Sequence, residues 1–255
     1  MCRLLGYAAS APLTLAELLG EPDLSRFTQL ACKHGDGWGF ARAGAGVVEV
    51  VKAPDSARLS PEFDRLVHQQ SADLAMVHLR WATLGLPVAQ RNAHPFTNGQ
   101  VAFAHNGSIR PPASLEPLLS KQVMPLLQGE TDSERFFLAV LSHLGVATDV
   151  DAVVRACAAA VHAVTSTLTY SSLNSMLITP NHLYALCAYD PKEELKEDEP
   201  EYYRLRHRRT ATSVVVSSSG WGSGWESLEN GQLLVVERAT LRTSIHSLSS
   251  CAARA

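Results

Sequence analysis

The chain opens with Met1-Cys2-Arg3-Leu4-Leu5-Gly6, in which a cysteine directly follows the initiator methionine. Cysteine is small enough for an aminopeptidase to remove Met1, which would leave a thiol and a free α-amine on one residue. An α-amine has a pKa of about 7.7–8.0 and a thiol one of about 8.5, so the amine can accept the thiol proton near neutrality. Cys2 is therefore a candidate nucleophile that carries its own base. The alternative interpretation is a buried apolar residue leading into a strand over 3–9.

Composition excludes several classes of protein. The 255 residues are 46% hydrophobic, enough to bury a full core. A net charge of -3 and a pI near 6.4 argue against a nucleic-acid partner. No apolar run approaches the ~18 residues of a membrane span, and no secretory signal is visible. Because the five cysteines are scattered and form no C-x-x-C pair, reduced thiols and a cytoplasmic location are expected.

Hydrophobic periodicity predicts a mixture of strands and helices, with no internal repeat and no linker. Strands are predicted at 3–9, 73–81, 100–104, 175–178, 183–188, 213–218 and 233–236, with a hairpin over 38–53. Helices are predicted after the capping boxes at 14–17 and 131–134, and over 61–70 and 151–164. The charged run 191–209 is expected to be a solvated loop or lid, and the tail from Ser244 shows little pattern.

A cationic side chain stands where one predicted strand ends. Arg80 lies near the end of the strand 73–81, and period two places it on the same face as His78. A guanidinium at a junction between strand and loop is suited to clamping a carboxylate. The alternative is an ordinary surface ion pair.

Two further polar motifs follow later in the chain. Asn106-Gly107 after a strand is either a hairpin turn or an oxyanion hole made of a side-chain amide and a backbone N–H. Asp132 at a helix start either binds a ligand or interacts with the helix dipole. His34 and Asp36 lack spaced partners, so no metal site is predicted.

These weak signals form an ordered set that resembles the class II glutamine amidotransferases, which are N-terminal-nucleophile hydrolases. The resemblance covers residues 2–145 by motif and the β-rich remainder by pattern. It rests on Met1-Cys2, Arg80-Trp81-Ala82-Thr83, Asn92-Ala93-His94-Pro95, His105-Asn106-Gly107 and Gly129-Glu130-Thr131-Asp132-Ser133-Glu134. It implies an α+β fold, a four-layer αββα sandwich of two antiparallel sheets between helices, with residues 2–255 as a single domain.

The resemblance also implies roles for the matching residues. Cys2 is the expected nucleophile, and Asn106 and Gly107 the expected oxyanion hole. Arg80 would bind the α-carboxylate of a glutamyl substrate and Asp132 its α-ammonium. The further substrate contacts implied are Trp81, Thr83 and His94. Leu84 stands where the sugar-phosphate-aminating members have a histidine, so the resemblance implies no substrate contact from position 84. No cofactor or metal is expected.

Two classes of function remain open. The first is an amidohydrolase that releases glutamate from glutamine or from another γ-glutamyl compound through a glutamyl thioester. The short start and Asp36-Gly37-Trp38-Gly39 resemble the stand-alone subgroup, which includes the γ-glutamyl hydrolase of ergothioneine synthesis. A variant of this function is a glutaminase subunit that feeds ammonia to a separate synthase. The second class is a catalytically silent binding protein on the same scaffold.

Two stretches are candidates for binding the leaving group, because the residues of the glutamyl half all precede residue 133. The basic run Arg206-His207-Arg208-Arg209 would favour an anionic group. Trp221 and Trp225, which flank Gly222-Ser223-Gly224, are suited to stacking on a planar ring. The alternative for both is plain surface and edge packing.

Overall fold

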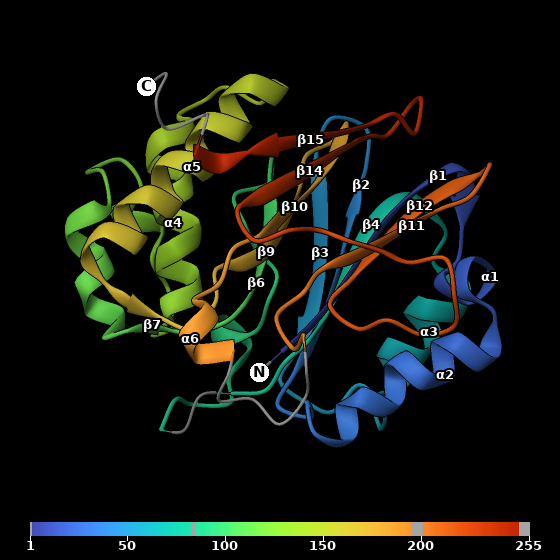
Figure 1. Ribbon diagram of the computed structural model, residues 1–255. Helices are drawn as coiled ribbons and strands as arrows, with labels where there is room; N and C mark the ends of the chain where they lie inside the picture. Colours follow the sequence, from blue (N-terminus) through green and yellow to red (C-terminus); the bar gives the residue numbers. More distant parts are fainter. Residues whose placement is uncertain (1, 83–84, 195–200, 250–255) are drawn as a thin grey trace.

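The computed structural model describes residues 2–82, 85–194 and 201–249. Two antiparallel sheets pack face to face, and helices cover the outer face of each (Figure 1). The predicted four-layer αββα sandwich is confirmed. None of the helices in the described ranges is long and apolar enough to cross a membrane.

The first sheet has seven strands, with the N-terminal strand near its centre. In spatial order they are β13 (Glu226–Ser227), β11 (Arg206–Arg209), β12 (Ser213–Ser217), β1 (Arg3–Leu13), β4 (Ala72–Leu79), β2 (Trp38–Ala43) and β3 (Val48–Ala53). β1 pairs with β12 on one side and with β4 on the other, in registers that place Leu5 opposite both Ser217 and Val77. The start of β1 therefore lies between the ends of two neighbouring strands.

The second sheet has six strands and comes mostly from the C-terminal half. In spatial order they are β15 (Thr243–Ser247), β14 (Gln232–Glu237), β10 (His182–Cys187), β9 (Asn174–Ile178), β6 (Ala102–Asn106) and β5 (Phe96–Thr97). A separate short ladder joins β7 (Ile109–Arg110) to β8 (Thr169–Tyr170).

The helices segregate by sheet. The first sheet is covered by α1 (Leu15–Leu19), α2 (Glu21–Gln29) and α3 (Pro61–Gln69), and the second by α4 (Asp132–Leu144) and α5 (Val150–Thr167). A single turn, α6 (Pro191–Glu194), follows β10. Short 3-10 helices lie at Leu30–Cys32, Gln90–Asn92, Pro112–Leu118 and Met124–Leu126.

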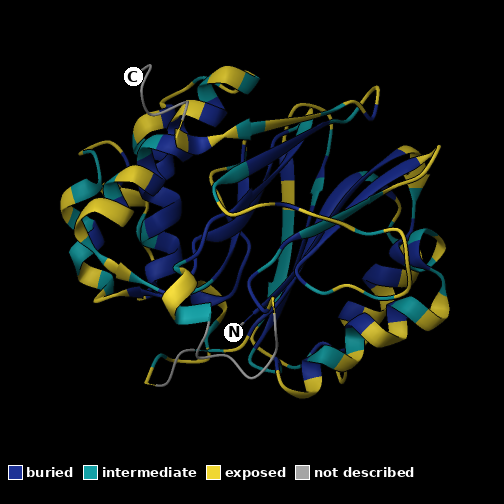
Figure 2. Ribbon diagram, in the orientation of Figure 1, coloured by how far each residue is buried: buried dark blue, intermediate teal, exposed yellow. Residues whose placement is uncertain are grey.

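Side chains alternate along β1, so this strand contributes to two hydrophobic clusters. Leu4 and Ala8 face the second sheet and contribute to the layer between the sheets. Leu5 and Tyr7 face the helices α1 to α3. Figure 2 shows the result as buried strands in the middle of the molecule, with exposed residues on the outer sides of the helices.

Two sequence-based expectations are wrong, and one helix was not predicted. Residues 201–209 are not a solvated loop: β11 pairs with β12 and β13, and Tyr203 and Leu205 are buried beside it. The tail contains a strand, β15, which pairs with β14. α2 was missed because its mean hydropathy is low, although its residues Leu24 and Phe27 are buried.

Candidate active site

The thiol of Cys2 lies immediately before β1 and is almost fully buried. The backbone N–H of Trp81 donates to Cys2 Sγ at 3.4 Å, and Sγ lies 3.7 Å from the Trp81 carbonyl oxygen. Burial raises the pKa of the thiol, while the Trp81 hydrogen bond and the Arg80 charge lower it and the Asp132 charge raises it. Arg80 and Asp132, the two charges expected to hold a glutamyl head, thus both act on this thiol.

Arg80 follows β4 and is held by the loop at Asp36. Its N–H donates to the Gly37 carbonyl at 2.8 Å, and its carbonyl accepts from the Asp36 N–H at 3.0 Å. Nη1 donates to the Asp36 carbonyl at 3.3 Å, and the Asp36 carboxylate accepts from the Ala82 N–H at 2.8 Å. Burial lowers the pKa of Arg80, which the Cys2 and Asp36 charges raise. Asp36 therefore fixes the segment that contacts Cys2, a role the sequence did not reveal.

The ring of Trp81 lies outside this polar arrangement. It is 38% exposed, with His34 packed edge-on at 5.6 Å and Lys33 over the ring at 4.9 Å. Its backbone rather than its ring contacts the thiol. Thr83, the next expected contact, and Leu84 lie outside the described residues.

Asn106 reaches the same region from the other sheet. It ends β6, which packs against β1 across the sandwich. Its side chain is fully buried, and within the described residues neither Oδ1 nor Nδ2 has a hydrogen-bond partner. Since an unpaired buried amide costs about 1–3 kcal/mol, the arrangement calls for a ligand group at this position.

Glycine is required after Asn106. A Cβ added to Gly107 would overlap the carbonyl oxygen of Ser172 and crowd His105 Nε2. The close approach of these two backbone segments holds the Gly107 N–H in a fixed position beside the Asn106 amide. The chain then enters β7, so the Asn-Gly pair does not close a simple hairpin between long strands.

Asp132 is tied to this loop rather than standing free at the helix start. Its Oδ2 accepts the Ile109 N–H at 2.7 Å, while Thr131 caps α4 by accepting the Glu134 N–H at 3.1 Å. Thr131 thereby caps the helix N-terminus, but the predicted capping box is not formed, because the Glu134 carboxylate accepts from the Gln128 and Gly129 N–H groups instead. Asp132 Oδ1 lies 3.5 Å from Ser133 Oγ and can still accept from a cationic ligand.

His105 clamps the elements that meet here. Its Nε2 lies 2.9 Å from the Ser172 carbonyl and its Nδ1 2.9 Å from Ser133 Oγ. A carbonyl only accepts, so Nε2 carries the proton and Nδ1 of the neutral ring accepts from the Ser133 hydroxyl. Burial lowers the pKa of His105, against the opposing effect of Asp132, and this keeps the ring neutral. β6, α4 and the segment before β9 are joined through one side chain.

Two more buried histidines, His78 and His94, lie close enough to Arg80 for its charge to lower their pKa values. The centroids of the His78 and His94 rings lie 4.1 Å apart, and within the described residues neither nitrogen of His94 has a hydrogen-bond partner. His94 also approaches the Asp36-Gly37-Trp38-Gly39 turn, where a Cβ on Gly39 would overlap the His94 carbonyl oxygen. The sequence placed His78 on the face of Arg80 but gave it no role.

Buried neutral histidines make the fold sensitive to acid. Burial lowers the pKa of His34 to about 3 and holds the pKa values of His78 and His94 well below 6.5. In the unfolded chain each returns to about 6.5, so below this pH the unfolded state binds protons that the native state does not. Stability is complete above pH 6.5 and is lost as pH falls toward the folded-state values. At about 1.4 kcal/mol per pH unit per histidine below pH 6.5, we expect the free energy of unfolding to drop by about 4 kcal/mol between pH 7 and 5.5.

Urea unfolding at both pH values checks this drop. His78→Phe fills a similar volume but cannot bind a proton, so its decrease in the free energy of unfolding between the two pH values should be about one third smaller than in the wild type. His143→Gln, on the exposed side of α4, should keep all of it. An unchanged drop in His78→Phe would mean that the buried imidazoles are not its source.

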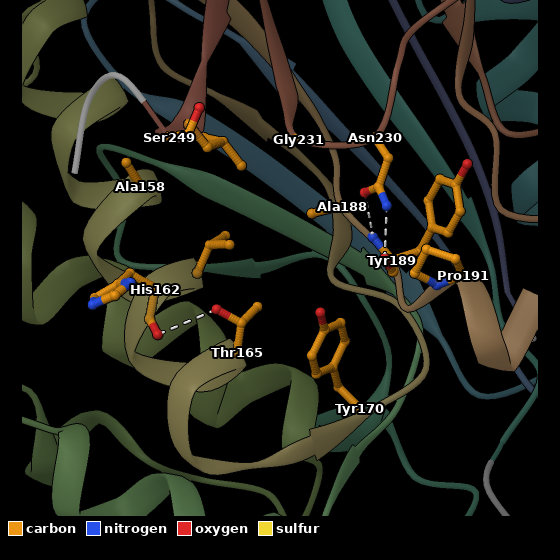
Figure 3. A pocket seen from close by; sticks show the side chains of 12 residues that line it. Ala158, His162, Thr165, Tyr170, Ala188, Tyr189, Pro191, Asn230, Gly231 and Ser249 are labelled. Atoms are coloured by element: carbon orange, nitrogen blue, oxygen red, sulfur yellow. Dashed lines mark hydrogen bonds between the residues drawn. The ribbon is translucent and has the colours of Figure 1, made fainter. Parts of the chain in front are cut away.

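The Arg80 and Asp132 charges thus act on Cys2, and His105 joins the strand that ends at Asn106 to the start of α4, whereas the Trp81 ring lies apart. Within the described ranges no group of three His, Cys, Asp or Glu side chains is arranged to hold a metal ion. One cavity of about 390 Å³, between α5 and the ends of β10 and β14, uses none of these residues (Figure 3). It is lined by Ala158, His162, Thr165, Tyr170, Tyr189 and Asn230 among others. Another, of about 620 Å³, includes Arg3, next to the candidate nucleophile.

Comparison with known proteins agrees with this geometry. An uncharacterized protein of Methanocaldococcus jannaschii is 26% identical over 94% of this chain and 70% of its own length. The probable glutamine amidotransferase DUG3 of Saccharomyces cerevisiae is 29% identical over 57% of this chain, and the match spans 47% of that relative. The glutamine aminotransferase class-II domain protein of Silicibacter pomeroyi has the same fold, with a TM-score of 0.67 and 19% identity over 96% of this chain and 99% of that one.

The family model described as "Glutamine amidotransferases class-II" matches residues 1–253, nearly the whole chain. The ordered motifs, the αββα sandwich and this match agree, and the chain belongs to the class II glutamine amidotransferases.

Proposed function

We propose that the protein is an amidohydrolase that cleaves the γ-glutamyl amide of glutamine or of a γ-glutamyl small molecule, with Cys2 as nucleophile. The observation that carries the proposal is the fully buried Asn106 amide, which has no partner among the described residues and follows a strand packed against β1. Such an amide is an unused donor in a water-poor place, where an oxyanion gains most from it. Residues 2–255 act as one domain in this proposal.

The reaction uses groups that this chain supplies. Once Met1 is removed, the α-amine of Cys2 accepts the thiol proton, and the thiolate attacks the γ-carbonyl carbon. The carbonyl π electrons move to oxygen, and the Asn106 Nδ2–H and Gly107 N–H donate to the resulting oxyanion. When the intermediate collapses, the C–N bond breaks, the amine leaves with the proton, and a glutamyl thioester remains on Cys2. Water then adds to the thioester through the same oxyanion site and releases glutamate and the thiol.

The substrate head is held from two sides. Arg80 binds the α-carboxylate with the N–H groups that its contact to Asp36 leaves available. Asp132 binds the α-ammonium through Oδ1, which makes only a long contact of 3.5 Å with Ser133 Oγ among the described residues, because Oδ2 already accepts from Ile109 at 2.7 Å. A zwitterionic head needs one cation and one anion at its ends, and charge-assisted hydrogen bonds are about twice as strong as neutral ones.

Substitutions at both ends test this recognition. Arg80→Lys keeps the charge but loses the bidentate fork, and we expect kcat/KM to fall at least about 10-fold, in line with about 1.5–3 kcal/mol for a charge-assisted hydrogen bond. Asp132→Asn should cause a similar fall while its amide oxygen still accepts from Ile109. Arg42→Lys, at an exposed ion pair with Glu49, is the control and should retain wild-type kinetics. Wild-type kinetics in both site variants would exclude a glutamyl head.

Processing of the N-terminus provides a direct test of the whole proposal. If the α-amine of Cys2 is the base, active enzyme must lack Met1, and intact mass should be lower by one methionine. Glutamate release from glutamine would be measured on the same preparation. A fully active preparation that retains Met1 would overturn the mechanism.

The alternatives make different predictions in that assay. A glutaminase subunit would hydrolyse glutamine slowly alone and faster with a synthase partner. The match to DUG3 covers 47% of that relative, so more than half of DUG3 lies outside the part that resembles this chain. We therefore keep the glutaminase subunit with a separate partner as an alternative. A silent binding protein would bind glutamine but release no glutamate. Neither alternative requires a cofactor, a metal, a nucleic acid or a membrane.

A further inference from the structure

The loop that carries the two expected oxyanion donors is held at both ends by the first turn of α4. At one end, the Ser133 hydroxyl donates to His105 Nδ1 across 2.9 Å. At the other end, the Ile109 N–H donates to Asp132 Oδ2 at 2.7 Å. The expected donors lie between these two anchors. Two neighbouring residues of one helix, Asp132 and Ser133, therefore hold the loop in place.

The anchor at His105 also reaches the backbone of Gly107. The His105 Nε2–H donates to the Ser172 carbonyl at 2.9 Å, and this carbonyl oxygen lies so close to Gly107 that a Cβ there would overlap it. The carbonyl is bonded only in the tautomer that has its proton on Nε2, and a donor at Nδ1 selects that tautomer. Ser133 is that donor, so its hydroxyl proton fixes the ring, the carbonyl and, through them, the Gly107 N–H.

The Ser133 hydroxyl has a second acceptor within reach. Asp132 Oδ1 lies 3.5 Å from Ser133 Oγ, whereas His105 Nδ1 lies at 2.9 Å. A hydroxyl has one proton to donate, so it cannot serve both acceptors fully. Because a carboxylate is charged, it makes the stronger hydrogen bond of the two at equal distance, which offsets part of its greater distance here. Asp132 therefore competes with His105 for one proton.

An ammonium group at Asp132 would end this competition. In the proposed function the substrate α-ammonium binds Oδ1, since Oδ2 is already bonded to Ile109. The ammonium offsets the charge of the carboxylate, so the Ser133 proton is left to His105 Nδ1. Asp132, Ser133 and His105 are all buried, and solvent therefore weakens these interactions little.

We propose, on the basis of the proposed function, that Ser133 and His105 are positioning residues that transmit occupancy of the α-ammonium site to the oxyanion hole. The amide is then cleaved at the full rate only when the glutamyl compound carries a free α-ammonium. This specificity acts on kcat and adds to the selection that Asp132 makes by binding. A glutamyl compound that lacks the amine binds without ordering the loop.

Two substrates and one substitution test this coupling. The substrates are glutamine and 4-carbamoylbutanoate, which is glutamine without its α-amine, and the substitution is Ser133→Ala. In the wild type, we expect kcat for glutamine to exceed kcat for 4-carbamoylbutanoate by at least about 10-fold. Ser133→Ala should lower this kcat ratio by a factor of about 5 or more, through a lower kcat for glutamine alone. The ratio of the two KM values should stay at the wild-type value, because Asp132 still binds the ammonium.

Ser142→Ala provides the matched control on the same helix. Ser142 Oγ donates to the Leu138 carbonyl at 2.8 Å and accepts the Ser120 N–H at 2.9 Å, so it stabilises α4 without contacting the loop. We expect a lower Tm in this variant and the wild-type kcat ratio. A Ser133→Ala variant with a lower Tm but the wild-type kcat ratio would make Ser133 a structural residue and overturn the proposal. So would an equal fall of the ratio in Ser142→Ala.

The His105 ring offers a second measurement that does not depend on turnover. The protein would be Cys2→Ala with ¹⁵N-labelled histidine, and the His105 signals would be identified by their absence in a further His105→Gln variant. Saturating glutamine should shift the Nδ1 resonance upfield, as expected for a nitrogen that accepts a stronger hydrogen bond, and saturating 4-carbamoylbutanoate should not. The same spectrum with both ligands would overturn the coupling. Failure of the wild-type enzyme to hydrolyse glutamine would instead overturn the proposed function.

Discussion

Cys2→Ala is expected to lower glutamate release from glutamine by a factor of at least ~10⁴, because loss of a nucleophile removes the covalent route altogether. The thiol is buried and contacts the Trp81 backbone, so alanine leaves a small gap and the fold should persist. Initial rates of glutamate formation and the thermal midpoint Tm together check this. Glutamine should still bind to Cys2→Ala, because Arg80 and Asp132 are unchanged.

A second free cysteine provides the control. Cys32 is exposed and accepts a hydrogen bond from Arg58, outside the site described above. Cys32→Ala should retain wild-type activity. This result would show that the loss of activity in Cys2→Ala comes from removing the nucleophile and not from removing any free thiol. A Cys2→Ala variant that kept more than about a tenth of the activity would contradict nucleophilic catalysis by this residue.

Much of the fold could be read from the sequence, since each central strand and the main helices carry local signals. Alternation along residues 73–81, the capping box at Thr14 and the N-cap at Thr131 act within a few residues, and the structure has these elements. The ordered motifs also predicted candidate site residues, because each motif stands where a strand or helix begins or ends. The positions of Arg80, Asn106 and Asp132 follow from that.

Interactions between distant parts of the chain gave no such signal. β11 consists of Arg206-His207-Arg208-Arg209, and it is a strand because β12 and β13 pair with it from either side. Asp36 supports Arg80 across 44 positions in the sequence. His105 joins Ser133 to Ser172 only after three elements have packed. Charge and periodicity describe a segment, whereas these roles depend on neighbours that tertiary packing supplies.

The two asparagines at the end of β6 and the start of β9 lead to the second large effect. Asn106 and Asn174 are register partners, and both are fully buried. Asn174 Oδ1 accepts the Ala188 N–H at 2.8 Å, and its Nδ2 donates to the Tyr203 carbonyl. The Asn106 amide has no partner among the described residues. The same residue type in a similar buried environment therefore has a fully paired amide at Asn174 and an unpaired one at Asn106, which matches the proposed role of Asn106 in binding a ligand group.

Asn106→Ala should lower kcat for glutamine hydrolysis by about 10²–10³-fold, the usual cost of one oxyanion donor. Its free energy of unfolding should stay the same or rise, because the substitution removes an unsatisfied buried amide. Asn174→Ala should leave kcat near the wild-type value but destabilise the fold by about 2 kcal/mol or more. This substitution leaves the buried Tyr203 carbonyl and Ala188 N–H without their hydrogen-bond partner. Steady-state kinetics and urea unfolding on both variants check the contrast.

The contrast separates catalysis from packing in a way that neither variant does alone. If Asn106→Ala lost stability along with activity, the amide would have a structural partner and the oxyanion role would lose its support. If both variants kept wild-type kcat, the oxyanion would be bound elsewhere. The expected pattern, in which activity falls with Asn106 and stability with Asn174, follows from one physical difference. Native folds pair their buried amides, and one left unpaired beside a nucleophile is free to stabilise charge that appears only during the reaction.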